Sequence, residues 1–193
     1  MSVLKTGKFS IEKNILTTPK ARLAFAALHQ PKPDFNDKPS FQATFLFDPE
    51  EVDLTLMRKI AKECLKNKNP KATFDFDKLF RDGDTKPETD GYPGHVFVQT
   101  KSKPEYPPLV FDQSTRKVGE DDIPGVASGD YVLGLLRPYA WEYKGSFGVS
   151  LGLVGVQLVK HGERFATGAA NVESLLEELP VDVDEIDEDE LTL

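Results

Sequence analysis

The sequence predicts a mainly β fold, in which an antiparallel barrel with one helix between its early and later strands is followed by a disordered acidic tail. Segments that alternate apolar and polar residues recur along the chain, about six in all, and this period of two is typical of strands. Only one segment has the apolar spacing of a helix. Glycine- and proline-rich turns separate these segments, a combination that favours a closed or nearly closed antiparallel barrel.

The early strands are marked by alternation. Residues 21–27 alternate in this way and predict a strand, which we expect to end at the proline-containing segment 30–34. The next strand is predicted over 41–47. Every second residue of that segment is apolar and is expected to face the core, namely Phe41, Ala43, Phe45 and Phe47.

The single predicted helix follows at Asp48. Asp48 can cap a helix, Pro49 suits its first turn, and Glu51 stands three residues after the cap. The helix is expected to end near 67–70. Its core face carries Met57, Ile60, Ala61, Cys64 and Leu65. The opposite face is rich in Lys and Arg, which we interpret as a solvated surface and not as a binding site.

The later part of the chain predicts four more strands. After an irregular segment, 70–94, strands are expected over 96–101, 109–111, 131–144 and 147–160. Gly145 and Ser146 connect the last two segments, and a two-residue connection of this kind predicts a hairpin. A short helix is expected between Asn171, as its cap, and Pro180.

The chain divides by charge into a body and a tail. Residues 173–193 contain ten acidic residues and no Lys or Arg, whereas residues 1–172 contain 22 acidic and 24 basic residues. We therefore expect one folded domain over 1–172, and a short helix with a disordered acidic tail over 173–193. Such asymmetry is typical of nucleic-acid-binding proteins, although a solubilising tail would give the same pattern. The acids of the tail are Asp182, Asp184, Glu185, Asp187, Glu188, Asp189 and Glu190.

Signatures of catalysis are missing from the sequence. The histidines His29, His95 and His161 are far apart and lack partners at metal-ligand spacing, and neither a phosphate-binding loop nor a nucleophile elbow is present. We therefore expect no enzyme activity, no metal and no cofactor. One cysteine, no secretory signal and no apolar run long enough to span a membrane predict a protein of a reducing cytoplasm.

A row of aromatic residues near the predicted hairpin is a candidate binding site. One strand face carries Arg137, Tyr139, Trp141 and Tyr143. Aromatic rings beside cations suit the stacking of unpaired bases, which every base allows. Lys144 lies on the opposite face and would have to reach around to a phosphate. Leu133 and Leu135 have the same parity as the row, so its rings could instead fill the barrel, with the end near the hairpin exposed.

A second cluster surrounds the strand predicted at 96–101. Phe97 and Lys101 share a strand face, while Tyr92, Lys103 and Tyr106 lie in the flanking loops. A phenylalanine among polar and cationic neighbours favours a stacking role, and the lysines could contact phosphates. The alternative is a phenylalanine covered by a loop.

These segments resemble the OB-fold single-stranded DNA-binding proteins that phages encode. The resemblance extends over most of the chain, through Gly91-Tyr92, Lys101-Ser102-Lys103, Pro108-Leu109-Val110, Gly129-Asp130-Tyr131-Val132, Tyr139-Ala140, Gly148-Val149-Ser150 and Gly162-Glu163. It implies an OB fold and the coating of single-stranded DNA during phage DNA replication, recombination and repair, in the cytoplasm of the infected bacterial host. It also implies that the acidic tail contacts replication proteins. Here the tail ends in Leu191-Thr192-Leu193, whereas the best-known relatives end in an aromatic residue.

We therefore expect a non-enzymatic protein that binds single-stranded DNA without sequence preference, and double-stranded DNA more weakly if at all. The tail is expected to compete with DNA for the basic surface and to recruit partners. The alternative is a protein-interaction module, such as an inhibitor whose tail mimics DNA. We expect no membrane association, and the oligomeric state is left open by the sequence.

Overall fold

A computed structural model describes residues 2–34, 36–123 and 125–165 of the chain. The elements are α1 (Val3–Thr6), β1 (Lys8–Ser10), β2 (Ile15–Thr17), β3 (Ala21–Pro33), β4 (Pro39–Phe47), α2 (Thr55–Lys68), η1 (Phe76–Lys78), β5 (Arg81–Asp82), η2 (Gly83–Thr85), β6 (Val96–Ser102), β7 (Leu109–Phe111), β8 (Tyr131–Tyr143) and β9 (Ser146–Lys160). The predicted helix between early and later strands is therefore α2.

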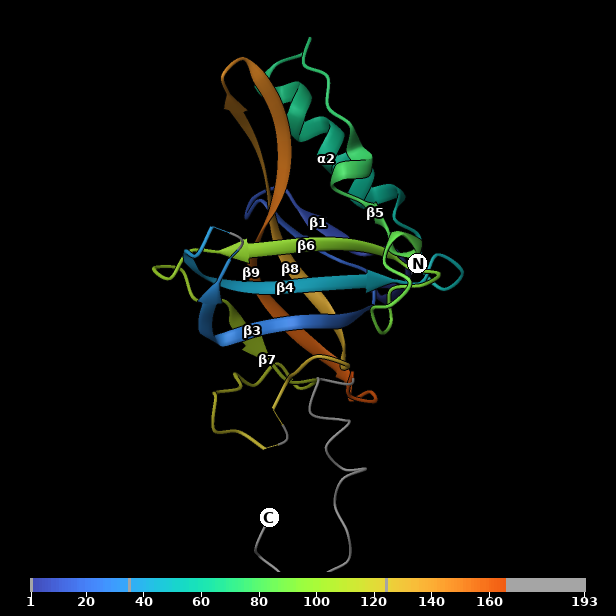
Figure 1. Cartoon of the computed structure of the whole chain (residues 1–193), viewed down its shortest axis with the longest axis vertical. Helices are drawn as coiled ribbons and strands as arrows, with labels where there is room; N and C mark the ends of the chain where they lie inside the picture. The colour runs from blue at the N-terminus through green and yellow to red at the C-terminus, as the bar shows by residue number, and fades with distance from the viewer. Residues whose placement is uncertain (1, 35, 124, 166–193) are drawn as a thin grey trace, which may run out of the picture.

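The strands form one strongly curved sheet. Its order is β1-β2-β8-β3-β4-β6-β5, and β9 pairs with β8 on one side and with β7 on the other. In Figure 1, β3, β4 and β6 lie side by side, while β8 and β9 cross behind them and rise together as an arm beside α2. The mainly β, OB-like architecture is confirmed. One detail differs from the wholly antiparallel prediction, because β7 pairs with β9 in parallel.

The core lies inside the curved sheet and under α2. The alternating residues of β4 are buried as predicted, with Phe45 and Phe47 fully inaccessible to solvent. They pack with the apolar face of α2, including Met57, and with β8 residues such as Leu136. Leu46, on the other face of β4, is also buried, because a second, smaller cluster covers this end of the sheet from outside.

Strand β3 is longer than the sequence predicts. The segment expected to break it continues the ladder with β4, where Lys32 pairs with Ser40 and Pro33 with Pro39. Proline is tolerated here because β3 pairs with β8 only at Ala21 and Arg22, so this part of β3 is a free edge on that side. The N–H that proline lacks is therefore not needed for a second ladder.

Helix α2 begins later than predicted. Asp48 caps a turn and not the helix: its Oδ1 accepts a hydrogen bond from the Glu50 backbone N–H at 2.8 Å. Val52 and Leu54 then pass through the core, which places the helix start at Thr55. The cap position is held by Leu54, which has no side-chain oxygen, and the Thr55 N–H donates to Asp53 Oδ1 at 2.8 Å.

The predicted hairpin of β8 and β9 is confirmed, with its turn one residue earlier than expected. Lys144 and Gly145 both have positive φ, 49° and 78°, as the two central residues of a type I′ turn require. The predicted strands at 96–101 and 109–111 correspond to β6 and β7, whereas β1, β2 and β5 were not predicted.

The predicted boundary at 172/173, the helix expected after Asn171 and the acidic tail lie outside the described residues. Within the described part of the chain, no helix is long and apolar enough to cross a membrane.

Candidate nucleic-acid interface

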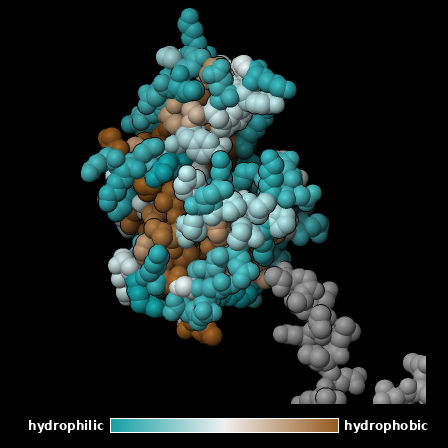
Figure 2. Space-filling model, turned by 90° about the vertical axis from the view of Figure 1, so that its left-hand side faces the viewer, coloured by the Kyte–Doolittle hydropathy of each residue, from teal (hydrophilic) through white to brown (hydrophobic). Residues whose placement is uncertain are grey.

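Two adjoining hollows on one face of the sheet form a continuous groove, because Lys101 and Tyr139 line both of them. One hollow is lined by Asp34, Gln42, Gln99, Thr100, Lys101, Tyr139, Ser150 and Leu151. The other is lined by Lys101, Ser102, Lys103, Glu105, Tyr106, Pro107, Leu109, Arg137, Tyr139, Gly152, Leu153 and Val154. Figure 2 views the side of the molecule towards which β6 points, and shows apolar surface exposed between hydrophilic regions.

Strand pairing brings these distant residues together. Lys101 stands opposite Gln42 across the β4–β6 ladder, and Tyr139 stands opposite Ser150 across the β8–β9 ladder. Beyond the end of β6, Tyr106 enters the groove from the following loop. Five residues predicted from sequence thus meet here, namely Lys101, Lys103, Tyr106, Arg137 and Tyr139.

The aromatic row continues from the groove along the arm. Tyr139, Trp141 and Tyr143 are 47%, 37% and 64% exposed. Earlier on β8, Leu133 is buried. The end of the row near the hairpin is open, as expected. Its beginning does not lie in the core: Leu135 is half-buried, and the β8 residues in the core cluster, Val132 and Leu136, have the other parity. Lys144 lies in the turn, with Nζ 5.2 Å from the centroid of the Tyr143 ring.

Small residues of β9 support the rings. Opposite the aromatic row stand Ser146, Gly148, Ser150 and Gly152. The Trp141 indole lies directly on Gly148, where a Cβ atom would overlap it, and Trp141 Nε1 donates a hydrogen bond to Ser150 Oγ at 3.1 Å. Each ring can therefore lie against the neighbouring strand and keep part of its surface open to solvent.

The groove carries both signs of charge. Lys103 and Arg137 bring positive charge, and Lys101 Nζ lies 2.9 Å from Asp34 Oδ2. The hydrogen bond from Lys101, with others from the backbone of Asn36 and Lys38, lowers the pKa of Asp34 below its usual value. Asp34 is therefore a fixed negative charge beside the most central lysine of the groove.

Tyr92 and Phe97 do not reach the groove surface, which corrects their predicted exposure. Both are fully buried, 4.8 Å apart between ring centroids, in a cluster with Ala24 and Leu46. The segment between β5 and β6 folds back over the sheet and places Tyr92 on Phe97; its geometry is fixed in part by a hydrogen bond from the Gly83 N–H to the His95 carbonyl. Burial raises the pKa of the Tyr92 hydroxyl. The alternative of a phenylalanine covered by a loop therefore holds for Phe97.

Sequence reasoning missed the polar and small residues of the groove. Gln42, Gln99, Ser150 and Gly152 line it, yet none belongs to a recognisable motif. Their only sequence signal is their strand parity. Gln99 shares a face with Lys101, and Gln42 becomes their neighbour once the β4–β6 register is known.

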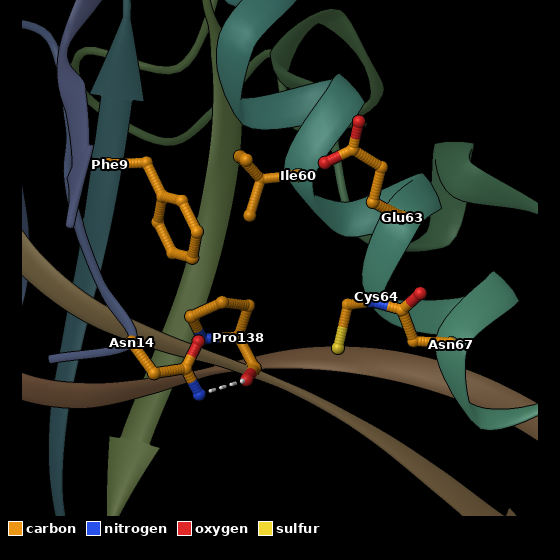
Figure 3. Close-up of a pocket in the computed structure, with 7 residues that line it drawn as sticks. All are labelled: Phe9, Asn14, Ile60, Glu63, Cys64, Asn67 and Pro138. Carbon is orange, nitrogen blue, oxygen red and sulfur yellow. Dashed lines mark hydrogen bonds between the residues drawn. The ribbon is translucent and has the colours of Figure 1, made fainter. Parts of the chain in front are cut away.

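A separate hollow lies between α2 and β8 (Figure 3). Ile60 and Cys64 point into it from α2, and Asn14 Nδ2 donates a hydrogen bond to the Pro138 carbonyl at 3.5 Å. Burial raises the pKa of the Cys64 thiol, which disfavours the reactive thiolate. Among the residues that the structure describes, no group of three or more His, Cys, Asp or Glu could hold a metal ion.

Comparison with known proteins identifies a family and a shared fold. The family model described as Enterobacter phage Enc34, ssDNA-binding protein, matches residues 14–190. The structure of the single-stranded DNA-binding protein from bacteriophage Enc34 in complex with ssDNA matches with a TM-score of 0.69 and 19% identity, covering 86% of this chain and 97% of that one. Another structure of the Enc34 protein matches with a TM-score of 0.68 and 19% identity, covering 90% and 97%.

A more distant likeness is to gp2.5, a single-stranded DNA-binding protein encoded by bacteriophage T7. Its TM-score is 0.52 at 17% identity, covering 88% of this chain and 98% of that one. At these identities the structural matches establish the shared fold. No curated protein sequence matches the chain.

Proposed function

Because the chain belongs to the family of the Enterobacter phage Enc34 ssDNA-binding protein, a family of binding proteins and not of enzymes, we propose that it binds single-stranded DNA in the groove around Tyr139. The observation that carries this proposal is the convergence, in one groove, of exposed rings and cations from β6, β8 and the loop after β6. The proposed interface contains Lys101, Lys103, Tyr106, Arg137, Tyr139, Trp141, Tyr143 and Lys144.

The rings and the cations have different roles in the proposed complex. Unpaired bases stack on Tyr139 and Trp141, and farther along the arm on Tyr143, at about 1–3 kcal/mol per base. Lys103 and Arg137 contact phosphates, which gives affinity without reading sequence. A duplex hides the base faces that these rings need, so double-stranded DNA binds more weakly.

The acidic tail completes the proposal. Its acids, from Asp182 to Glu190, carry the same charge as a DNA backbone and compete with DNA for the cations of the groove. When DNA occupies the groove, the tail is available to replication proteins. We place this activity in phage DNA replication, recombination and repair, in the cytoplasm of the infected bacterial host.

A salt titration of binding tests the proposal. Fluorescence anisotropy with labelled oligo-dT should give a log–log slope of roughly −0.7 for each phosphate neutralised, or about −2 if Lys101, Lys103 and Arg137 all contribute. The matched duplex should bind more weakly at every salt concentration. No binding to single strands at low salt, either by the full chain or by a chain without its tail, would overturn the proposal and favour the interaction-module alternative.

A pair of lysine variants locates the interface. Lys103→Gln removes a cation of the groove and should reduce the magnitude of the slope by about 0.7. Lys59→Gln removes an exposed cation of α2, away from the groove, and should leave the slope unchanged. Equal effects of the two substitutions would mean that the groove is not where the phosphates lie.

A further inference from the structure

A strained and exposed phenylalanine interrupts β3. Phe25 has a φ of 48°, in the left-handed region that bulky residues avoid, and its side chain is 62% exposed. Four other non-glycine residues of the described chain have positive φ, and all lie between strands: Asn14, Asp37, Thr115 and Lys144. Phe25 is the one inside a strand. It therefore combines a strained backbone with an exposed apolar ring, and neither favours folding.

A β-bulge explains the backbone of Phe25. Ala24 pairs with Thr44 and Ala27 with Gln42, so β3 has one more residue than β4 in this interval. The Ala26 N–H leaves the ladder and donates to Ser128 Oγ at 3.0 Å. Bulges redirect side chains, and glycine is the usual residue where the extra position is left-handed. A phenylalanine at this position directs a ring to the surface at a cost in strain.

The ring of Phe25 lies on the same face of the sheet as the groove. It meets the Tyr92 ring edge-on, with 6.2 Å between centroids. Tyr92 packs on the outer face of β3, β4 and β6, against Ala24, Leu46 and Phe97. On β6, Phe97 shares its strand face with Gln99 and Lys101, which line the groove. The buried Tyr92–Phe97 pair therefore lies between the groove and Phe25 on this face of the sheet.

Two cations, Arg81 and Lys86, lie between the groove and Phe25. Arg81 Nη1 donates to Gln99 Oε1 at 2.9 Å, while its guanidinium lies 5.0 Å from the Phe97 ring centroid. Lys86 Nζ lies 5.4 Å from the centroid of the Tyr92 ring. A strand that leaves the groove at Gln99 would pass these charges before it reached Phe25.

From this continuity we infer that Phe25 is a second stacking position, which takes a base of the same DNA strand that the groove binds, with Arg81 and Lys86 near its phosphates. The inference rests on the proposed function and extends the interface from Tyr139 across Gln99 to the bulge in β3. An exposed ring that packs edge-on against the buried Tyr92 ring offers a base an open face.

The test is Phe25→Asn, because asparagine accepts the left-handed conformation and has no ring. Its thermal midpoint should be no lower than that of the wild type, because backbone strain is relieved. Affinity for an oligo-dT of about 16 nucleotides should fall by about 5- to 150-fold, the loss expected for one stacked base. Phe25→Trp should retain affinity. Ile11→Asn, at a residue 86% exposed in the turn after β1, is the control and should bind as the wild type does.

One result would overturn the inference. Affinity of Phe25→Asn within about twofold of the wild type would exclude a stacked base at this position, and a lowered midpoint beside it would mean that the ring serves folding alone. Tyr139→Ala, measured beside it, separates this failure from failure of the proposed function. If that variant loses affinity while Phe25→Asn does not, the groove is supported and the extension is wrong, whereas no binding by the wild type defeats both.

Discussion

Replacing Tyr139 by alanine should weaken the binding of single-stranded DNA without unfolding the protein. Tyr139 lines both halves of the groove, so a strand following the groove must pass its ring. The ring is 47% exposed and stands opposite Ser150, so its removal leaves no cavity in the core. The free energy of unfolding should therefore change by about 0.5 kcal/mol or less.

The expected loss of affinity follows from the loss of one stacking surface. Aromatic stacking contributes about 1–3 kcal/mol per base, and about 1.4 kcal/mol corresponds to a tenfold change in Kd. Tyr139→Ala should thus raise Kd by about 5- to 150-fold. The salt slope should stay unchanged, because no cation is removed.

Fluorescence anisotropy with labelled oligo-dT at fixed ionic strength measures this effect, and circular dichroism checks the fold. Tyr139→Phe keeps the ring and serves as the control, with a Kd expected within about twofold of the wild type. A folded Tyr139→Ala variant with wild-type affinity would refute the stacking role. Equal weakening by Tyr139→Phe would show that the hydroxyl, and not the ring face, contacts DNA.

Three further predictions address the arm, the charge of the groove and the tail. Fluorescence of Trp141, the only tryptophan, should be quenched at saturating oligo-dT, and unchanged emission with binding verified separately would remove Trp141 from the interface. Asp34→Asn should tighten binding a few-fold at low salt, because it removes a negative charge beside Lys101. Because the pKa of Asp34 is lowered, the wild-type carboxylate stays ionised near pH 5. The gain in affinity from Asp34→Asn should therefore be the same near pH 5 as near pH 7. A gain that vanished near pH 5 would contradict this charge assignment. Removing residues 181–193 takes away seven acids and no base, changing the net charge from −8 to −1; the truncated protein should stay folded and bind more tightly, and unchanged or weaker binding would mean that the tail does not compete with DNA.

The sequence predicts the long strands well because their pattern is local. Alternation in β4 and in the β8–β9 hairpin follows directly from a sheet with one face in the core. The start of α2 was misplaced because Asp48 has the local features of a cap, whereas the burial of Val52 and Leu54 decides where the helix begins. The short strands β1, β2 and β5 are paired residues held by tertiary contacts, and too few residues alternate in them to give a signal.

In the candidate site, too, local patterns were predictable from the sequence and tertiary contacts were not. Parity along one strand was enough to place Tyr139, Trp141 and Tyr143 on one face, and the structure shows that this face is exposed. It could not show that Phe97 is buried, because the segment that covers it belongs to a stretch without periodicity. Phe25 escaped notice for a related reason. Its position looks like an ordinary strand residue until the register with β4 reveals the bulge.

The small residues opposite the aromatic row have a consequence for how this protein tolerates mutation. Gly148 takes no part in hydrogen bonding of side chains and carries no charge, yet any larger residue there would displace the Trp141 indole. In a saturation library scored for DNA binding, the Trp141 position should accept other flat rings. The Gly148 position should accept almost nothing. Intolerance at Gly148 would then mark a residue that shapes the binding surface by supporting the Trp141 ring, although it lies outside the lining of the groove.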